Sequence, residues 1–103
     1  MDTKSLLTEA KARFAHNSAK HYLQEKFSSK LLVAEQGGLW RADKETLNFL
    51  YNTHLVQKET VLLDIYNNPI KVNSLELYKK LMEVYNVVME EWHNEWKELE
   101  NKR

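Results

Sequence analysis

A 29-residue segment near the C-terminus, from Ser74 to Lys102, has an apolar pattern that predicts a long helix with one apolar face. Apolar side chains recur there every seven residues in two adjacent rows. At about 100° per residue the rows merge into one broad stripe along a helix of about 40 Å. The 73 residues before this segment are too few to cover its length easily, so we expect part of the stripe to contact another chain. The rows are Tyr78, Tyr85, Trp92 and Leu99, and Leu75, Met82, Met89 and Trp96, with Leu81 and Val88 between them.

We expect that contact at the far end of the helix. Trp92, Trp96 and Leu99 lie farther along than the body of a small domain needs to reach, and large exposed aromatic side chains are rare without a partner. Together with Met89 they form the predicted interface. Because closed two-fold contacts are the commonest way to cover such a surface, we expect a homo-oligomer, most simply a dimer. The alternative is that the stripe covers only its own chain, which we expect for residues 78–88.

The composition is that of one soluble domain spanning residues 1–103, with 43% hydrophobic and 29% charged residues. No apolar run approaches the roughly 18 residues that a membrane span needs, and the N-terminus lacks the apolar segment of a signal peptide. We therefore expect no membrane contact and a cytoplasmic location. The absence of cysteine excludes disulfides and thiolate metal sites.

The 15 basic and 15 acidic residues cancel, which argues against a general polyanion binder, but they are unevenly distributed. Residues 1–58 carry nine Lys or Arg against six Asp or Glu, and residues 59–103 carry six against nine. Either two solvated faces attract each other within the fold, or subunits pair head to tail.

The first segment predicts a helix from Thr3 to Phe27, because it has no Gly or Pro and is rich in Ala, Leu, Lys and Glu. Ser28 and Ser29 are expected to end it. The side chains expected to share one face are Leu7, Phe14, Ala15, Ala19, Tyr22, Leu23 and Phe27.

Two segments then predict β-hairpins, each followed by a helix. In the first, strands at residues 31–35 and 39–42 flank a turn containing Gly37 and Gly38, either of which can take a positive φ. In the second, strands at residues 60–66 and 70–72 flank an Asn-Asn-Pro turn. Asp43 is expected to cap a short helix that ends at Asn52, and Asn73 with Glu76 forms a capping box for the final helix.

These elements predict an α+β fold: a long N-terminal helix, two hairpins forming a small antiparallel sheet, a short middle helix and a long C-terminal amphipathic helix. We favour a three- or four-stranded sheet covered on one face by the long helices. In the main alternative, the long helices form an extended antiparallel hairpin with the strands clustered at one end.

No residue pattern indicates a catalytic centre, a cofactor or a metal site. His16 and His21 are five residues apart, which separates them by about 140° around a helix. Glu90 and His93 form a Glu-x-x-His element, but di-metal bundles need two copies of it and further inward carboxylates. We therefore expect a protein that is not an enzyme and that binds no metal.

Nucleic-acid binding is a weaker interpretation. Lys11, Arg13 and Lys20 make the first helix basic, and Trp40 beside Arg41 offers a stacking surface. The basic residues are interleaved with acidic ones, so nucleic acid is not the favoured partner.

The segment KLLVAEQGGLWRADKETLNFL, with a Lys-, Asn- and Glu-rich helical context and an acidic aromatic tail, resembles small proteins of large contractile-tailed bacteriophages. Prohead core, or internal scaffold, components are the nearest of these. The resemblance implies capsid or virion assembly through protein contacts, in the host cytoplasm or the virion, without enzymatic activity. The alternative is a small regulator that binds a host or phage protein, or nucleic acid, through the hairpins and the basic first helix. The resemblance is centred on Gly37, Gly38, Leu39, Trp40, Asp43 and Leu47.

Overall fold

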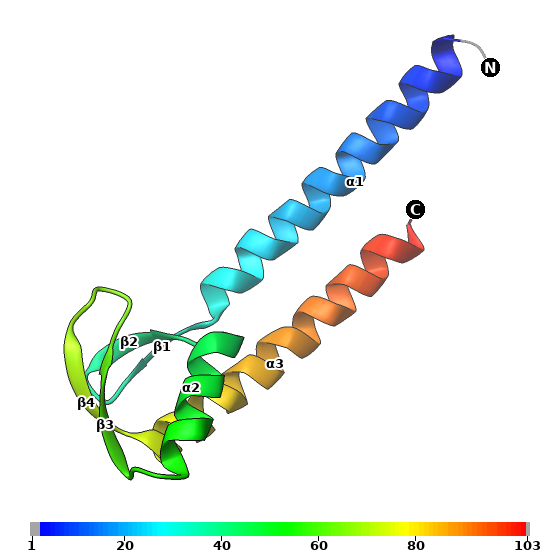
Figure 1. The fold of residues 1–103 in the computed structure, drawn as a ribbon. Coiled ribbons are helices and arrows are strands. Elements are labelled where there is room, and N and C mark those ends of the chain that lie inside the picture. The colour runs from blue at the N-terminus through cyan, green and yellow to red at the C-terminus, as the bar shows by residue number, and fades with distance from the viewer. Residues whose placement is uncertain (1–2, 103) are drawn as a thin grey trace.

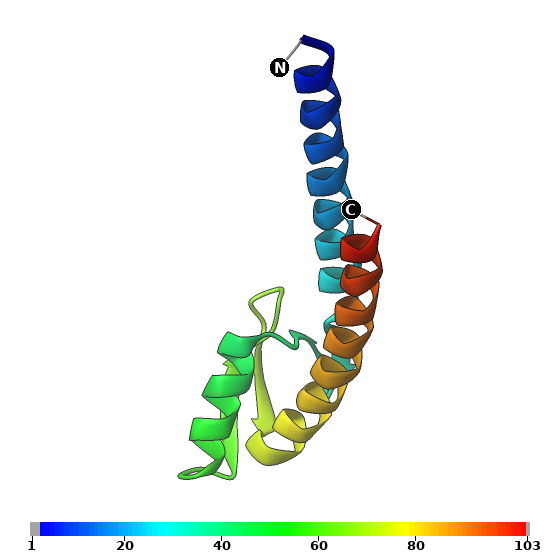
Figure 2. The same ribbon diagram turned by 90° about the vertical axis from the view of Figure 1, so that its right-hand side faces the viewer.

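The computed structural model describes residues 3–102, in which two long helices extend from a small mixed head (Figure 1). The molecule measures 64 × 24 × 20 Å. The two long helices, α1 and α3, run antiparallel and side by side in both views, and we call this pair the stalk (Figure 2). The α+β class is confirmed. The elements are α1 (Thr3–Lys30), β1 (Leu32–Glu35), β2 (Gly38–Arg41), α2 (Lys44–His54), β3 (Glu59–Leu63), β4 (Pro69–Asn73) and α3 (Ser74–Asn101).

The strands of the described chain form two separate antiparallel pairs, β1 with β2 and β3 with β4. The favoured single sheet of three or four strands is therefore wrong, and the alternative arrangement is the one observed. The hairpins make contact chiefly through side chains and isolated bonds. A Cβ on Gly38 would lie 2.7 Å from Ile70 Cδ1, and Ile65 N–H donates to the Leu39 carbonyl over 3.0 Å. Contacts of this kind leave the two ladders distinct.

The first hairpin closes with a two-residue turn at Gln36 and Gly37, whose φ angles are 48° and 84°. Glu35 pairs with Gly38 across it. Two consecutive positive φ values fit the type I′ turn that matches the twist of a hairpin. The predicted positive φ is confirmed at Gly37, whereas Gly38 is the first residue of β2.

The C-terminal ends of α1, α2 and β3 differ from the predicted ones. α1 does not stop at Ser28 and Ser29, because the Ser29 hydroxyl donates to the Lys26 carbonyl over 2.7 Å and leaves the helical backbone intact through Lys30. α2 continues past Asn52 to His54. β3 ends at Leu63, before the predicted residue 66, because the next residue organises a turn.

That residue is Asp64, a buried carboxylate between the hairpins. Its Oδ1 accepts backbone N–H groups from Tyr66 at 3.0 Å and Asn68 at 2.9 Å, and its Oδ2 accepts from Leu39 at 3.4 Å. These bonds favour the ionised form and hold the pKa of Asp64 below its ordinary value. The Asn68 N–H has the largest effect, followed by those of Tyr66 and Leu39. Asp64 thereby joins the β3–β4 turn to β2.

The core lies mainly in the head, where buried side chains of the hairpins, α2 and the first half of α3 form one cluster. Trp40 is only 1% exposed, and its indole N–H donates to the Glu35 carbonyl over 2.8 Å. The C-terminal part of α1 contributes Leu23 and Phe27 to this core. The other buried apolar side chains are Leu31, Val33, Ala42, Leu47, Leu50, Val72, Leu77, Leu81 and Val88.

Candidate interaction surface

The apolar stripe of α3 has three differently covered parts. Its centre, with Leu81 and Val88, is buried. The row that contains Tyr85 and Trp92 is half-buried against the core. The row that contains Met89 and Trp96 is the least covered toward the end of the helix, where Trp96 is 40% exposed.

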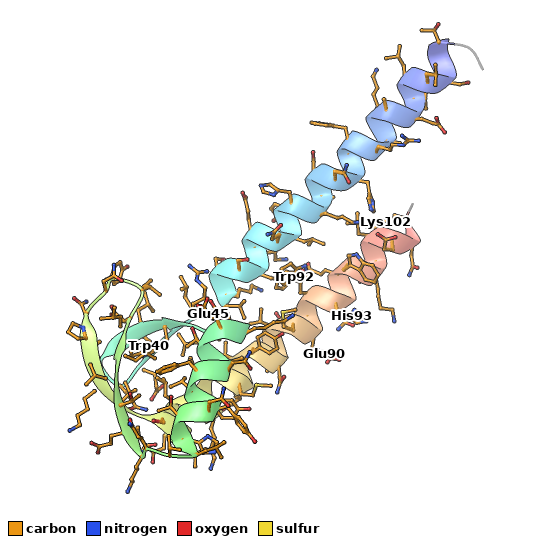
Figure 3. The ribbon with its side chains drawn as sticks, in the orientation of Figure 1. Trp40, Glu45, Glu90, Trp92, His93 and Lys102 are labelled. Atoms are coloured by element: carbon orange, nitrogen blue, oxygen red, sulfur yellow. The ribbon has the colours of Figure 1, made fainter. Side chains whose placement is uncertain are left out.

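Two of the four predicted interface residues, Trp92 and Leu99, have partners in their own chain. Trp92 stacks on Phe27 of α1, with ring centroids 5.8 Å apart, and points toward α1 in Figure 3. Leu99 packs against the core cluster. The expectation that the rest of the chain fails to reach the end of α3 is wrong for this side, because α1 runs along it.

The other two predicted interface residues, Met89 and Trp96, are only partly covered by their own chain. Met89 is half-buried, and the ring of Trp96 stacks on that of His93 with centroids 5.9 Å apart. At 100° per residue Met89, His93 and Trp96 lie within about 60° of one another, and we call these three residues the Trp96 edge. Met82, seven residues before Met89 in the same row of α3, lines a groove of about 360 Å³ between α2 and α3. The other lining residues are Lys44, Leu47, Asn48, Tyr51, Tyr78 and Tyr85.

Charged pairs fix the alignment of the stalk. Lys26 Nζ lies 2.8 Å from Glu95 Oε1, and Lys30 Nζ lies 3.5 Å from Glu91 Oε2. The hydrogen bond to Glu95 raises the pKa of Lys26, against the opposing effect of partial desolvation. Each pair joins a lysine of the basic half of the sequence to a glutamate of the acidic half. In the stalk the two halves therefore attract each other within one fold.

Nearer the free end, His16 Nε2 lies 3.2 Å from Glu100 Oε1. Residues before it have no part of α3 beside them, because α1 continues past the end of α3 in both views (Figures 1 and 2). We call residues 3–15 of α1 the arm. At 1.5 Å per residue the arm is about 20 Å long.

The arm exposes large apolar side chains: Leu6 is 53% exposed, Leu7 54% and Phe14 74%. The predicted single apolar face of α1 is therefore wrong. Leu23 and Phe27 are buried, but Leu7 and Phe14 lie on a different side of the helix. The projection angles alone reveal this division, because Leu7 and Phe14 are about 160° from Leu23 and Phe27 on average.

The residues of the nucleic-acid interpretation do not come together. Lys11, Arg13 and Lys20 are exposed on α1, whereas Arg41 is exposed on β2 in the head. Trp40 cannot stack on a base because it is buried in the core. Only the exposed basic residues of α1 still support nucleic-acid binding, because the predicted stacking residue is buried.

Glu90 and His93 are exposed and lie on the side of α3 that faces away from α1 (Figure 3). Within residues 3–102, no three His, Asp or Glu side chains lie close enough to hold a metal ion. None of the helices in this described range has both the length and the apolar character that a bilayer span requires.

Compared with protein-family models, with curated proteins and with solved structures, the chain gives no significant match.

Proposed function

We propose that this chain is a non-enzymatic structural or assembly protein that self-associates through the Trp96 edge of α3. The observation that carries the proposal is the exposure of Trp96 beside Met89 on a helix that projects from the head. Exposed indole rings at the end of an apolar stripe are characteristic of protein contacts. The setting implied by the phage resemblance is capsid or virion assembly, in which such contacts are the function.

Sedimentation at micromolar concentration tests this proposal. The wild-type chain is expected to sediment above its monomer mass of 12.3 kDa, and Trp96→Ala is expected to shift the equilibrium toward the monomer. Phe49→Ala is the matched control, because Phe49 is a similarly exposed aromatic residue of the head, at 44% against 40% for Trp96. A wild-type chain that remains a 12.3 kDa monomer would overturn the proposal.

The alternative, a small regulator that binds nucleic acid, is supported by the exposed Lys11, Arg13 and Lys20 on α1. The same samples mixed with labelled DNA or RNA distinguish the two functions. Salt-sensitive binding that is lost in a Lys11→Ala, Arg13→Ala variant would favour the regulator.

A further inference from the structure

We propose that the arm of one copy lies on the Trp96 edge of a second copy, and that the second arm reciprocates, so that a two-fold dimer covers both surfaces. This inference rests on the proposed self-association and identifies the segment that fills the edge.

The arm cannot be covered by its own α3. Its apolar side chains Leu7, Ala10 and Phe14 lie within about 60° of one another, about 150° from the Leu23 and Phe27 side that packs on α3. Even a longer α3 would therefore contact the opposite face of the arm. In addition, isolated helices of this length are marginal in water, so a partner would stabilise the arm as a helix.

The charges favour the partner's α3 over the partner's arm. The arm carries Lys4, Lys11 and Arg13 against Glu9, so two arms side by side would repel each other. Residues 90–102 of α3 carry five Glu against two Lys. A basic arm on this acidic segment is the attractive combination, and a two-fold dimer makes this contact twice.

The spacing of the apolar residues fits the same arrangement. A two-fold axis perpendicular to the stalk reverses the partner, so α1 of one copy runs parallel to α3 of the other. Leu7 and Phe14 are seven residues apart, and Met89 and Trp96 are also seven apart. Parallel helices keep equal spacings in step, so both pairs of side chains can meet along one seam.

Disulfide trapping tests the contact directly, because the chain has no cysteine of its own. Ala10→Cys places a single thiol between Leu7 and Phe14 of the arm, and His93→Cys places one between Met89 and Trp96 of the edge. The four large apolar side chains stay in place. Within one chain these positions are far apart: the Lys26–Glu95 and Lys30–Glu91 pairs place His93 beside about residue 28, so Ala10 lies about 27 Å along the axis. A disulfide needs Cα atoms within about 7 Å, so any bond between these positions joins two copies.

Mixing the two reduced variants and oxidising them slowly is expected to give the mixed disulfide as the main product, identified by mass spectrometry. Ala12→Cys mixed with His93→Cys is the control, because Ala12 lies about 160° around the helix from Ala10 and should give little of this product. A predominant Ala10→Cys homodimer would overturn the inference in favour of arm-to-arm pairing.

The dimer dissociation constant gives an independent readout in the cysteine-free chain. Phe14→Ser is expected to raise it at least about tenfold, whereas Tyr22→Ser, an exposed aromatic of the same helix, should change it less than about twofold. Circular dichroism should show that the head and stalk stay folded, since Phe14 is 74% exposed, and the signal should fall by no more than that of the arm helix. If Trp96→Ala weakens the dimer and Phe14→Ser does not, self-association stands and the arm contact is wrong. A monomeric wild-type chain would overturn both.

Discussion

The indole ring of Trp92 lies nearly parallel to the ring of Phe27, with the planes 13° apart and the centroids separated by 5.8 Å. The ammonium groups of Lys26 and Lys30 lie 5.1 and 5.0 Å from the centroid of the Phe27 ring. The same two lysines pair with carboxylates of α3. One turn of α1 therefore supplies both the apolar contact and the ion pairs that hold the two helices of the stalk together.

Removal of either ring is expected to destabilise the fold. Phe27 is 1% exposed, so Phe27→Ala should cost about 3–5 kcal/mol of unfolding free energy, and Trp92→Ala should cost less because Trp92 is only half-buried. Urea unfolding of the single and double variants should give a coupling of about 0.5–1.5 kcal/mol between the rings. Additive effects of the two changes would contradict a direct contact.

The two glycines of the first hairpin should resist substitution for different reasons. Gly37→Val forces a β-branched residue to a φ of 84° and should cost about 1–3 kcal/mol. Gly38→Val should cost about as much through overpacking, because its Cβ would lie 2.7 Å from Ile70 Cδ1 and from the Trp40 ring.

Asparagine separates these two causes. Because Asn tolerates the left-handed region, Gly37→Asn should lose clearly less stability than Gly37→Val, whereas Gly38→Asn should gain nothing over Gly38→Val. Thermal unfolding measures all four variants. Equal losses for Asn and Val at Gly37 would show that φ is not the cause there.

The helix caps were predictable because their chemistry is local. Asp43 Oδ1 accepts the Thr46 N–H at 2.9 Å, and Asn73 Oδ1 accepts the Glu76 N–H at 3.0 Å, as the sequence indicates. The return bond of the capping box is different: the Asn73 N–H donates to Gln36 Oε1, in the turn of the other hairpin, over 2.8 Å. A partner 37 residues away in the sequence cannot be found from capping patterns.

How the hairpins and helices pack together was harder to predict from the sequence, because it too depends on contacts between residues far apart in the chain. Hydrophobic periodicity locates the strands, but it does not show how the two hairpins contact each other. That depends on long-range contacts such as Gly38 against Ile70 and the bonds of Leu39 to Asp64 and Ile65. In the candidate interaction surface, periodicity located Trp96 and Met89 correctly on the α3 stripe. It could not show that α1 would cover Trp92, because that depends on how the two long helices align in space. The exposure of Phe14 follows from its place on the side of α1 away from Phe27, which the helical projection shows.

Asp64 should make the fold sensitive to acid. Since folding lowers the pKa of this carboxyl below 3.8, its contribution to stability is present above that value and is lost as the pH falls below 3.8 toward the folded pKa. Asp64→Asn should therefore be less stable than the wild type at pH 7, and the difference should shrink below pH 3.8. Urea unfolding across this range measures it, with Glu83→Gln as the control at an exposed carboxylate. A difference that does not change with pH would show that the charge of Asp64 has no part in joining the hairpins.

The Lys26–Glu95 pair should act in the opposite direction on the alkaline side. Folding raises the pKa of Lys26 above 10.5, so the contribution of the pair is complete below pH 10.5 and is lost as the pH rises through the folded value. Glu95→Gln should lower stability at pH 8, and its difference from the wild type should shrink above pH 10.5 and in high salt, which screens partly exposed charges. Glu98→Gln, on an exposed face of the same helix, corrects for general loss of negative charge. Equal effects of the two substitutions at every pH would mean that α1 and α3 are held together by the Phe27–Trp92 contact without help from this ion pair.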